Sequence, residues 1–332
     1  MVRQSRGVPD PLEPERLRNR FRLFEIAALP SVMGQTNQDF AWLLIVDPAL
    51  GVADRRRLEA LIEPRRRSYL HAYDPGEDLE GTAWLAPYLA SEPDYLITTN
   101  LDDDDALPNA FVAELQEGVR RLATEGAPVI FAGARQSIEW DLLLTPDTPY
   151  GFVAPWHRRG NAGRRVSSCG FSVACRHPDY PFSVRGMSHV LAAHHLDFAA
   201  PPQRPVIKRI RRRLLAAAAS AGDDLEGFSV ESTFLDTSAT AGPALMTNHL
   251  GNLQAARVLA RKDATPVAGP ETFPDFTLGW DALARYESEF RLTRRIRLRR
   301  VLWRARRGTR RWYRRSRLGR WVGAAQRFAS RR

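Results

Sequence analysis

The sequence predicts an α/β protein in which helices cover a mostly parallel β-sheet on both sides. Between residues 14 and 132, short apolar segments alternate with segments whose apolar residues recur at three- and four-residue steps. Strands that alternate with helices in this way are typical of parallel sheets. The chain has 332 residues, 44% of them hydrophobic, which is enough for a sizeable core.

The first elements set this pattern. Apolar spacing predicts a helix over residues 14–34, with a kink or an end near Pro30, because proline cannot donate the helical hydrogen bond. The apolar run over residues 41–46 predicts a strand buried on both faces, and a helix follows over residues 54–62.

The later elements are less regular. Residues 137–173 indicate strands and loops, so an α/β half gives way to a mixed half near residue 135. Residues 201–227 combine prolines, a basic helix and an acidic turn, which indicates an insertion or a mobile loop. The other predicted elements are strands near 68–72, 95–99, 129–132 and 243–247, helices near 79–90 and 110–123, and a basic helical region beyond Trp280.

Composition bears on the compartment. No stretch approaches the roughly 18 consecutive apolar residues of a membrane-spanning helix, and the first residues lack the apolar core of a signal peptide. We therefore expect a cytoplasmic protein. Cys169 and Cys175, the only cysteines, fit neither a disulfide framework nor a zinc site, and we expect them to pack in the core.

Charge is unevenly distributed along the chain. The net charge is +11, but residues 290–332 hold eighteen arginines and no acid, so the remainder carries 11 − 18 = −7. Residues 291–328 read as a basic helix that also bears tryptophans. Such helices bind anionic membrane surfaces, which we expect here; nucleic-acid binding and a solvated tail without a partner are the alternatives.

The strongest chemical signal is the acidic run, Asp102, Asp103, Asp104 and Asp105, which directly follows the predicted strand 95–99. Carboxylates crowded at the end of a strand repel one another unless a cation lies among them, and oxygen-only ligands suit Mg²⁺ or Mn²⁺. The alternative is a solvated turn in which Asp105 or Asn109 caps the following helix. Calcium-loop spacing does not fit, because Leu107 and Ala113 stand where that loop needs Gly and Glu.

Several segments together resemble a known family. Residues 101–108 are similar to the DXD segment of GT-A glycosyltransferases, and residues 29–40 to their helix-to-strand element. With residues 20–24 and 248–252, they resemble the rhamnosyltransferase family over residues 18–255. The resemblance implies a GT-A fold, a Rossmann-like mixed sheet, over residues 1–265, with a nucleotide-binding half over 14–135, an acceptor half over 136–265, and a basic helical tail over 266–332.

The same resemblance implies site residues. Asp104 is the leading metal ligand, with Asp105 beside it and Asp102 on the metal or the ribose. His249 would complete the metal shell, although a lone histidine is more often structural. Asp103 and Arg20 are expected to contact the substrate, and Asp47 to contact the base or ribose or else to form a turn beside Pro48.

The implied reaction is sugar transfer from a dTDP-, UDP- or GDP-linked donor, with Mn²⁺ or Mg²⁺ at the diphosphate, to a glycan or lipid-linked acceptor. An inverting enzyme also needs a base for the acceptor hydroxyl, and the candidates are Asp179, His189, Asp223 and Asp224. Inversion and retention both stay open. The segment 167–172 forms either the acceptor side or a plain core strand.

One departure from the family pattern concerns the first strand. GT-A domains open with a strand and a nucleotide-holding loop, whereas this chain reaches its first helix without one. We expect that strand to be encoded upstream of Met1.

Two rival functions use the same residues. A metal-dependent phosphoesterase or nuclease would combine the acidic run with the basic tail, but no HExxH motif supplies further ligands. A non-catalytic surface-binding protein with a degenerate site is the other. P-loop, GxGxxG and GxSxG motifs are absent from the sequence.

Overall fold

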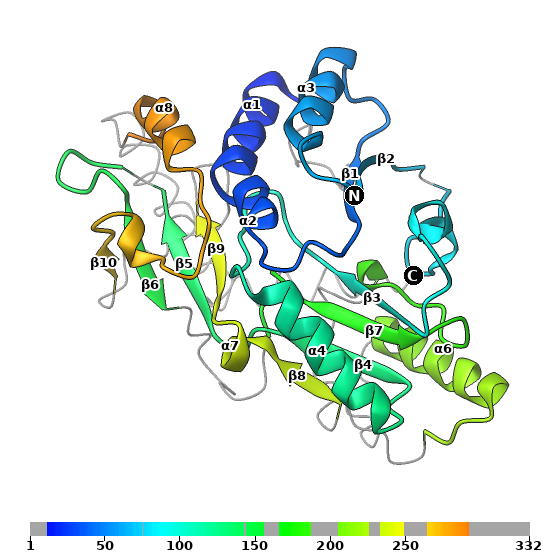
Figure 1. Ribbon diagram of the computed structural model, residues 1–332. Helices are drawn as coiled ribbons and strands as arrows, with labels where there is room; N and C mark the ends of the chain where they lie inside the picture. The colour runs from blue at the N-terminus through cyan, green and yellow to red at the C-terminus, as the bar shows by residue number, and fades with distance from the viewer. Residues whose placement is uncertain are drawn as a thin grey trace, which may run out of the picture.

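Strands of the chain form three separate sheets (Figure 1). The structure, a computed structural model, describes residues 12–74, 76–142, 144–155, 166–186, 205–225, 233–248 and 264–291. Helices and strands alternate along these residues, which confirms the predicted α/β class. The expectation of one mostly parallel sheet is wrong, because two of the three sheets contain antiparallel pairs.

The predicted helix over residues 14–34 forms in three parts: α1 (Pro14–Leu23), the π-helical turn η1 (Phe24–Ala28) and α2 (Leu29–Met33). Pro30 has no N–H to give to the carbonyl of Ile26, four residues earlier. That carbonyl instead accepts a 2.8 Å hydrogen bond from the N–H of Gly279, which begins α8 (Trp280–Phe290). The irregularity expected near Pro30 therefore attaches the C-terminal helix of the described chain.

The first sheet pairs β1 (Trp42–Val46) with β2 (Ser68–Ala72) in parallel. α1, η1 and α3 (Val52–Ile62) cover one face, where Phe24 and Ile62 pack with Trp42 and Leu44. All five residues of β1 are only half-buried. The prediction that β1 is buried on both faces is wrong. The face opposite these helices is covered only in part within the described residues, by Trp84 and Tyr88, which pack on Tyr69 and His71 of β2.

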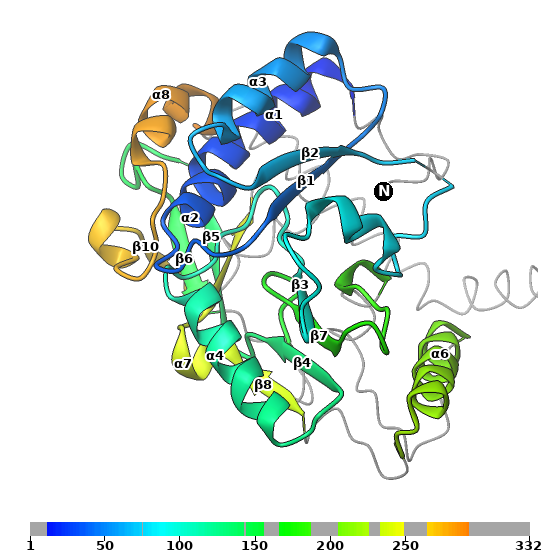
Figure 2. The same ribbon diagram turned by 45° about the vertical axis from the view of Figure 1, so that its right-hand side comes forward.

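The second sheet has the order β3-β7-β4-β8, with β7 antiparallel to both neighbours. α4 (Phe111–Thr124) packs on one face and α6 (Pro205–Ala221) on the other, as Figure 2 shows. The strands are β3 (Tyr95–Thr99), β7 (Ser172–Arg176), β4 (Val129–Gly133) and β8 (Phe234–Asp236).

The basic helix predicted within residues 201–227 forms as α6, but the prediction that this segment is an insertion or mobile loop is wrong for the described residues 205–225. Ile210, Leu214 and Ala218 recur at four-residue spacing and are buried against β4 and β7. These three apolar residues make the helix a covering layer of the second sheet, although arginines separate them in the sequence.

The third sheet has the order β10-β6-β5-β9 and continues the second. β5 (Ser137–Asp141) follows β4 closely, and β9 (Ala244–Asn248) follows β8 after α7 (Thr237–Thr240). The remaining elements are β6 (Phe152–Pro155), β10 (Thr265–Pro266) and the 3₁₀ turns η2 (Ala83–Tyr88), η3 (Val184–Gly186) and η5 (Pro270–Thr272).

Two boundaries differ from expectation. The helix predicted near 79–90 is the six-residue 3₁₀ turn η2, which contains Pro87. Residues 266–291, expected to begin the tail, contribute Val267, Phe273 and Leu283 to a core cluster shared with α1, η1 and β5. This described part of the expected tail therefore packs with the body.

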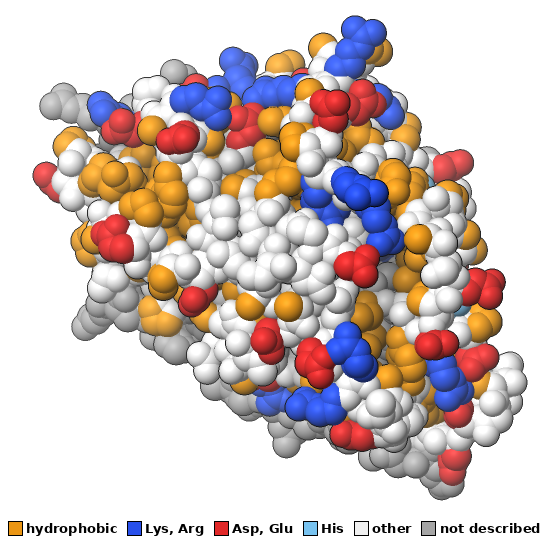
Figure 3. Space-filling view, viewed as in Figure 1, with side chains coloured by type: hydrophobic (Ala, Val, Ile, Leu, Met, Phe, Trp, Pro, Cys, Tyr) orange, Lys and Arg blue, Asp and Glu red, His pale blue; other side chains and the backbone are white. Residues whose placement is uncertain are grey.

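The surface of the body is mixed in charge. On the face seen in Figure 3, acidic and basic side chains are interspersed. Among the described residues, no helix is long and apolar enough to cross a membrane.

Candidate functional site

The acidic run lies where β3 ends, at the junction of the second and third sheets. Asn100 holds its beginning: its N–H donates to the carbonyl of Phe171, and its carbonyl accepts from the N–H of Gly170, both at 2.9 Å. Ala106 holds its end through a β-bridge to Leu245 of β9. Fixed on both sides, the run is presented at the carboxyl end of a strand, the usual edge for ligand binding in α/β sheets.

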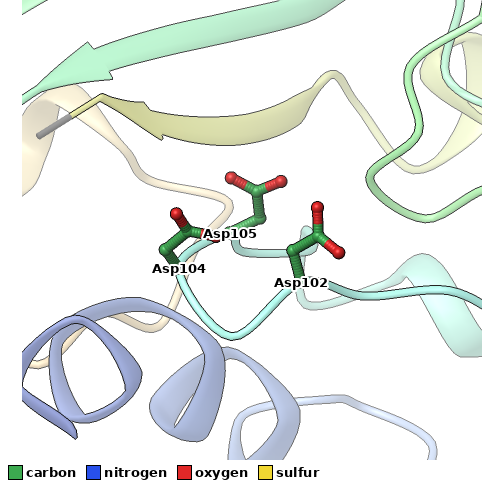
Figure 4. A group of neighbouring side chains, drawn as sticks. All are labelled: Asp102, Asp104 and Asp105. Carbon is green, nitrogen blue, oxygen red and sulfur yellow. The ribbon is translucent and has the colours of Figure 1, made fainter. Parts of the chain in front are cut away.

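Three carboxylates of the run converge. Asp102, Asp104 and Asp105, the acidic triad, each offer an oxygen, and these oxygens all lie within 4.8 Å of one another. Figure 4 shows the three side chains projecting from one loop toward β9. Asp104 and Asp105 are only 8% and 7% exposed. The sequence expectation that these residues share a site is consistent with this geometry.

Asp105 is the most constrained member of the triad. Its Oδ1 accepts a 3.0 Å hydrogen bond from the N–H of Thr247, while the Thr247 hydroxyl donates to the backbone carbonyl of Asp104. Burial raises the pKa of Asp105 well above its ordinary value, and the charges of Asp104 and Asp102 raise it further, against the lowering effect of the Thr247 N–H.

Arg20 brings a positive charge to the run from the last turn of α1. Its Nε donates to Oδ2 of Asp103 at 2.6 Å, and its Nη2 donates to the other oxygen of the same carboxylate. Its Nη1 lies 3.7 Å from Oδ2 of Asp104. Arg20 therefore touches both the triad and the one carboxylate outside it.

The triad fits a small divalent cation. Mg²⁺ binds oxygen at about 2.1 Å, so two ligands of one ion lie at most roughly 4.2 Å apart. Oxygens within 4.8 Å of one another need only a small side-chain adjustment to meet that limit. The donor set is oxygen only, which suits Mg²⁺ or Mn²⁺. The raised pKa of Asp105 reflects burial first and then repulsion by Asp104 and Asp102, which a cation would relieve.

Gln35 connects the helix-to-strand element to the acidic run. Its side-chain N–H₂ donates to the carbonyls of Ser31 and Pro108 at 2.9 and 2.8 Å. Its Oε1 accepts from the N–H of Val112 at 3.0 Å, in the first turn of α4. One buried amide thus fixes the segment that follows α2 against the segment that follows the acidic run.

The alternative in which the run merely caps α4 is wrong. The N-cap of α4 is Ala110, without a side-chain cap, and Gln35 satisfies the N–H of Val112 from another segment. Asn109 instead accepts from the N–H and hydroxyl of Thr277, both at 2.9 Å.

Comparison with known protein families finds a match over the segment that makes these contacts. Residues 11–131 match the family described as "putative rhamnosyl transferase". This confirms the resemblance predicted from the sequence. The matched rhamnosyl transferase segment begins ahead of α1 and ends in β4, so it contains Arg20, Gln35 and the whole acidic run. No curated protein matches the chain.

Asp47 also lies within the rhamnosyl transferase match, directly after β1. Its Oδ1 accepts from the N–H of Ala49 at 2.9 Å, and its carbonyl accepts from the N–H of Leu50 at 3.0 Å. This is the geometry of the turn that was one of the two alternatives predicted for Asp47. Contact with a base or ribose stays a prediction.

The described candidates for the acceptor base lie away from the acidic run. Asp179 and Asp223 both bind Arg176, and Arg176 is paired with Tyr95 at the amino end of β3. The acidic run follows the opposite end of that strand. Asp224 adjoins Asp223, so the structure brings none of the three to the triad. His189 and His249 lie outside the described residues, as do residues 292–328 of the expected membrane-binding helix.

Two buried carboxylates that the sequence prediction missed lie nearer the run. Glu139 and Asp141 on β5 are 5% and 0% exposed and flank Trp140, whose partner on β9 is Thr247. Since Thr247 binds Asp105, both lie about two strand spacings, roughly 10 Å, from the triad. The signal was present: acids alternate with apolar residues along residues 137–141, so they share the face opposite Trp140.

The segment 167–172 is also close to the run. Its N–H and carbonyl groups bind Asn100, and the Sγ of Cys169 lies 3.6 Å from the carbonyl of Ala106. The first part is a turn, and β7 begins at Ser172. A role on the acceptor side stays a prediction.

Proposed function

We propose that the chain is a metal-dependent glycosyltransferase of the GT-A type, which transfers a sugar from a nucleoside-diphosphate donor to a glycan or lipid-linked acceptor. The observation that carries the proposal is the acidic triad at the carboxyl end of β3, inside the segment that matches rhamnosyl transferases. The family description favours rhamnose as the donor sugar. Fold alone would not support an activity, but a converging ligand set at the usual site does.

Some residues would bind the metal, and others hold those metal ligands in place. Asp102, Asp104 and Asp105 would hold Mn²⁺ or Mg²⁺, and Thr247 orients Asp105. The metal supplies positive charge that stabilises the departing nucleoside diphosphate. Gln35 and Asn100 hold the backbone on either side of the triad, which keeps the carboxylates in place without movement during the reaction.

We propose Glu139 and Asp141 as the candidates for the acceptor base, in place of the residues that bind Arg176. Both are buried carboxylates near the triad, and a carboxylate is a usual base for a hydroxyl group. A Glu139→Gln variant is expected to keep metal-dependent nucleotide binding and to lose hydrolysis of the donor, in which water replaces the acceptor. Unchanged hydrolysis in both Glu139→Gln and Asp141→Asn would rule the pair out.

The proposed donor site is tested by calorimetric titration of dTDP, UDP and GDP, each with and without Mn²⁺. Three proteins are compared: the chain itself, Asp104→Asn and the matched control Asp179→Asn. Asp179 is a carboxylate of the same type that binds Arg176 at the far end of the second sheet.

Binding that needs Mn²⁺, prefers one base, and disappears only in Asp104→Asn would support the proposal and identify the nucleotide. Equal binding by Asp104→Asn would exclude the triad as the metal site. Absence of nucleotide binding, together with metal-dependent cleavage of a phosphodiester, would favour the phosphoesterase alternative.

A further inference from the structure

Arg20 is a positively charged group already placed in the proposed metal site. Its guanidinium binds Asp103 with two N–H groups, and its third nitrogen lies 3.7 Å from Asp104 of the triad. Asp104 has a side chain that is only 12% exposed, so the screening of its charge by water is weak. A divalent cation and Arg20 would therefore act on the same carboxylate.

The position of Arg20 allows it to turn without moving the fold. The backbone of α1 is anchored beside it, since Phe21 and Leu23 are buried. The Arg20 side chain, in contrast, is 38% exposed. A flexible guanidinium on a fixed helix can leave one anion for another, and its planar pair of donors matches carboxylate and phosphate equally well.

We propose that Arg20 is an exchangeable counter-ion: it neutralises Asp103 and Asp104 while the metal site is empty, and it turns to the donor diphosphate once a metal binds. The inference rests on the proposed function, because it requires a metal at the triad and a diphosphate beside that metal. Arg20 would then have two opposed effects. It would weaken binding of the metal by itself, and it would strengthen binding of the nucleotide to the metal-bound protein.

These opposed effects define the test. Removing the charge in Arg20→Gln is expected to strengthen binding of Mn²⁺ alone by several-fold, because a competing cation is lost. The same change is expected to weaken binding of the preferred nucleoside diphosphate to Mn²⁺-saturated protein by about tenfold, the usual loss for a charged hydrogen bond. Arg20→Lys keeps the charge but not the paired donors, so only the second effect is expected there.

The matched control is Arg22→Gln. Arg22 lies on the same helix and loses the same charge, but it pairs with Glu289 and not with the acidic run. Calorimetric titration of the full chain with Mn²⁺ alone, and then with nucleotide at saturating Mn²⁺, is carried out on all four proteins after circular dichroism confirms that each is folded.

Each outcome is decisive. Stronger Mn²⁺ binding with weaker nucleotide binding in Arg20→Gln alone would support the exchange. Equal Mn²⁺ binding by Arg20→Gln and the parent chain would overturn it while leaving the donor site standing, and so would a matching change in Arg22→Gln, which would indicate general charge. If the parent chain binds no Mn²⁺, the proposed function fails and the inference fails with it.

Discussion

Asp105 is the residue at which stability and metal binding are most directly opposed. Its folded pKa is raised above the ordinary value of 3.8, first by burial and then by Asp104 and Asp102. An acid with a raised folded pKa contributes most below its unfolded pKa, and that contribution is lost as pH rises through the folded pKa. Without metal, the free energy of unfolding is therefore expected to fall as pH rises above 3.8, the ordinary pKa, and through the raised pKa of Asp105 in the folded protein.

Asp105→Asn should remove this pH dependence. The amide keeps an oxygen for the N–H of Thr247 and carries no charge. Each unit of pKa elevation is worth about 1.4 kcal/mol, so we expect the metal-free variant to melt roughly 3 °C or more above the parent chain at pH 8, with a smaller difference at pH 5. Addition of Mn²⁺ should raise the parent melting temperature more than that of the variant.

Differential scanning calorimetry at both pH values, with and without Mn²⁺, measures these shifts. A variant that melts lower than the parent at every pH would show that the Asp105 carboxylate stabilises the fold, contrary to this prediction.

The two cysteines should be inert in the folded protein. Both are fully buried, which confirms the core role predicted from the sequence. Burial raises the pKa of Cys175 to about 12 and that of Cys169 well above its ordinary value, with Asp105 adding to the second shift. Because the thiolate is the reactive form, a disulfide reagent at pH 8 should label neither thiol until the protein is unfolded in guanidinium, when two react. Rapid labelling of native protein would contradict this.

At the scale of elements, Glu25 joins three helices. The π-turn η1 places this buried side chain between Arg57 of α3, at 2.5 Å, and Tyr286 and Arg285 of α8, at 3.1 and 3.3 Å. A π-turn inserted in a helix shifts the following residues relative to α-helical spacing. Here it directs the Glu25 carboxylate to Arg57, 32 residues later in the chain, and to Arg285, 260 residues later.

Glu25→Gln should loosen this junction. Because Arg57 and Arg285 are 43% and 65% exposed, solvent screens their attraction, and we expect a loss of about 1–2 kcal/mol in the free energy of unfolding. Urea denaturation measures the change. The control is Glu287→Gln on α8, whose carboxylate binds Arg291 at an exposed site and should cost under about 0.5 kcal/mol. Equal losses of unfolding free energy in both variants would contradict the role of Glu25 in joining the three helices.

Elements with strong local signals were predicted well from the sequence. β3 and α4 match their predictions closely because apolar periodicity and length agree there. The helix predicted near 79–90 is wrong because Pro87 limits that segment to a 3₁₀ turn. The basic helix of α6 was predicted, but its packing on the sheet was not, because prolines and arginines outweighed the spacing of Ile210, Leu214 and Ala218. What a strand or helix packs against was the main missing information.

The site was predictable where its residues are adjacent in sequence. The triad comes from one segment, so its convergence follows from local order at the end of β3. Thr247 and Glu139 belong to strands that reach the run only through the pairing of β9 with β5 and with Ala106. Such pairing is a property of the whole sheet. The pairing of β7 with β3 likewise places Arg176, with Asp179 and Asp223, at the opposite end of β3.

At the scale of the whole molecule, the first sheet is joined to the second without a shared strand. Within the described residues, β1 pairs only with β2 and β3 pairs only with β7, so side-chain contacts such as those of Gln35 join the two parts.

The arginine-rich segment gives the last prediction. Seventeen of the eighteen arginines between residues 290 and 332 lie beyond Arg291, the last residue that the structure describes. Attraction to an anionic bilayer is worth about 1 kcal/mol for each basic residue near the surface. The full chain should therefore float with vesicles containing anionic lipid, and a chain ending at Arg291 should not.

Salt and lipid composition distinguish the partners of this segment. Flotation should fall steeply between low and high ionic strength, because the Debye length shrinks from about 10 Å at 0.1 M to 3 Å at 1 M. Equal flotation with neutral vesicles would contradict the electrostatic anchor. Binding to DNA by the full chain, with no flotation at all, would favour the nucleic-acid alternative, since both partners are polyanions.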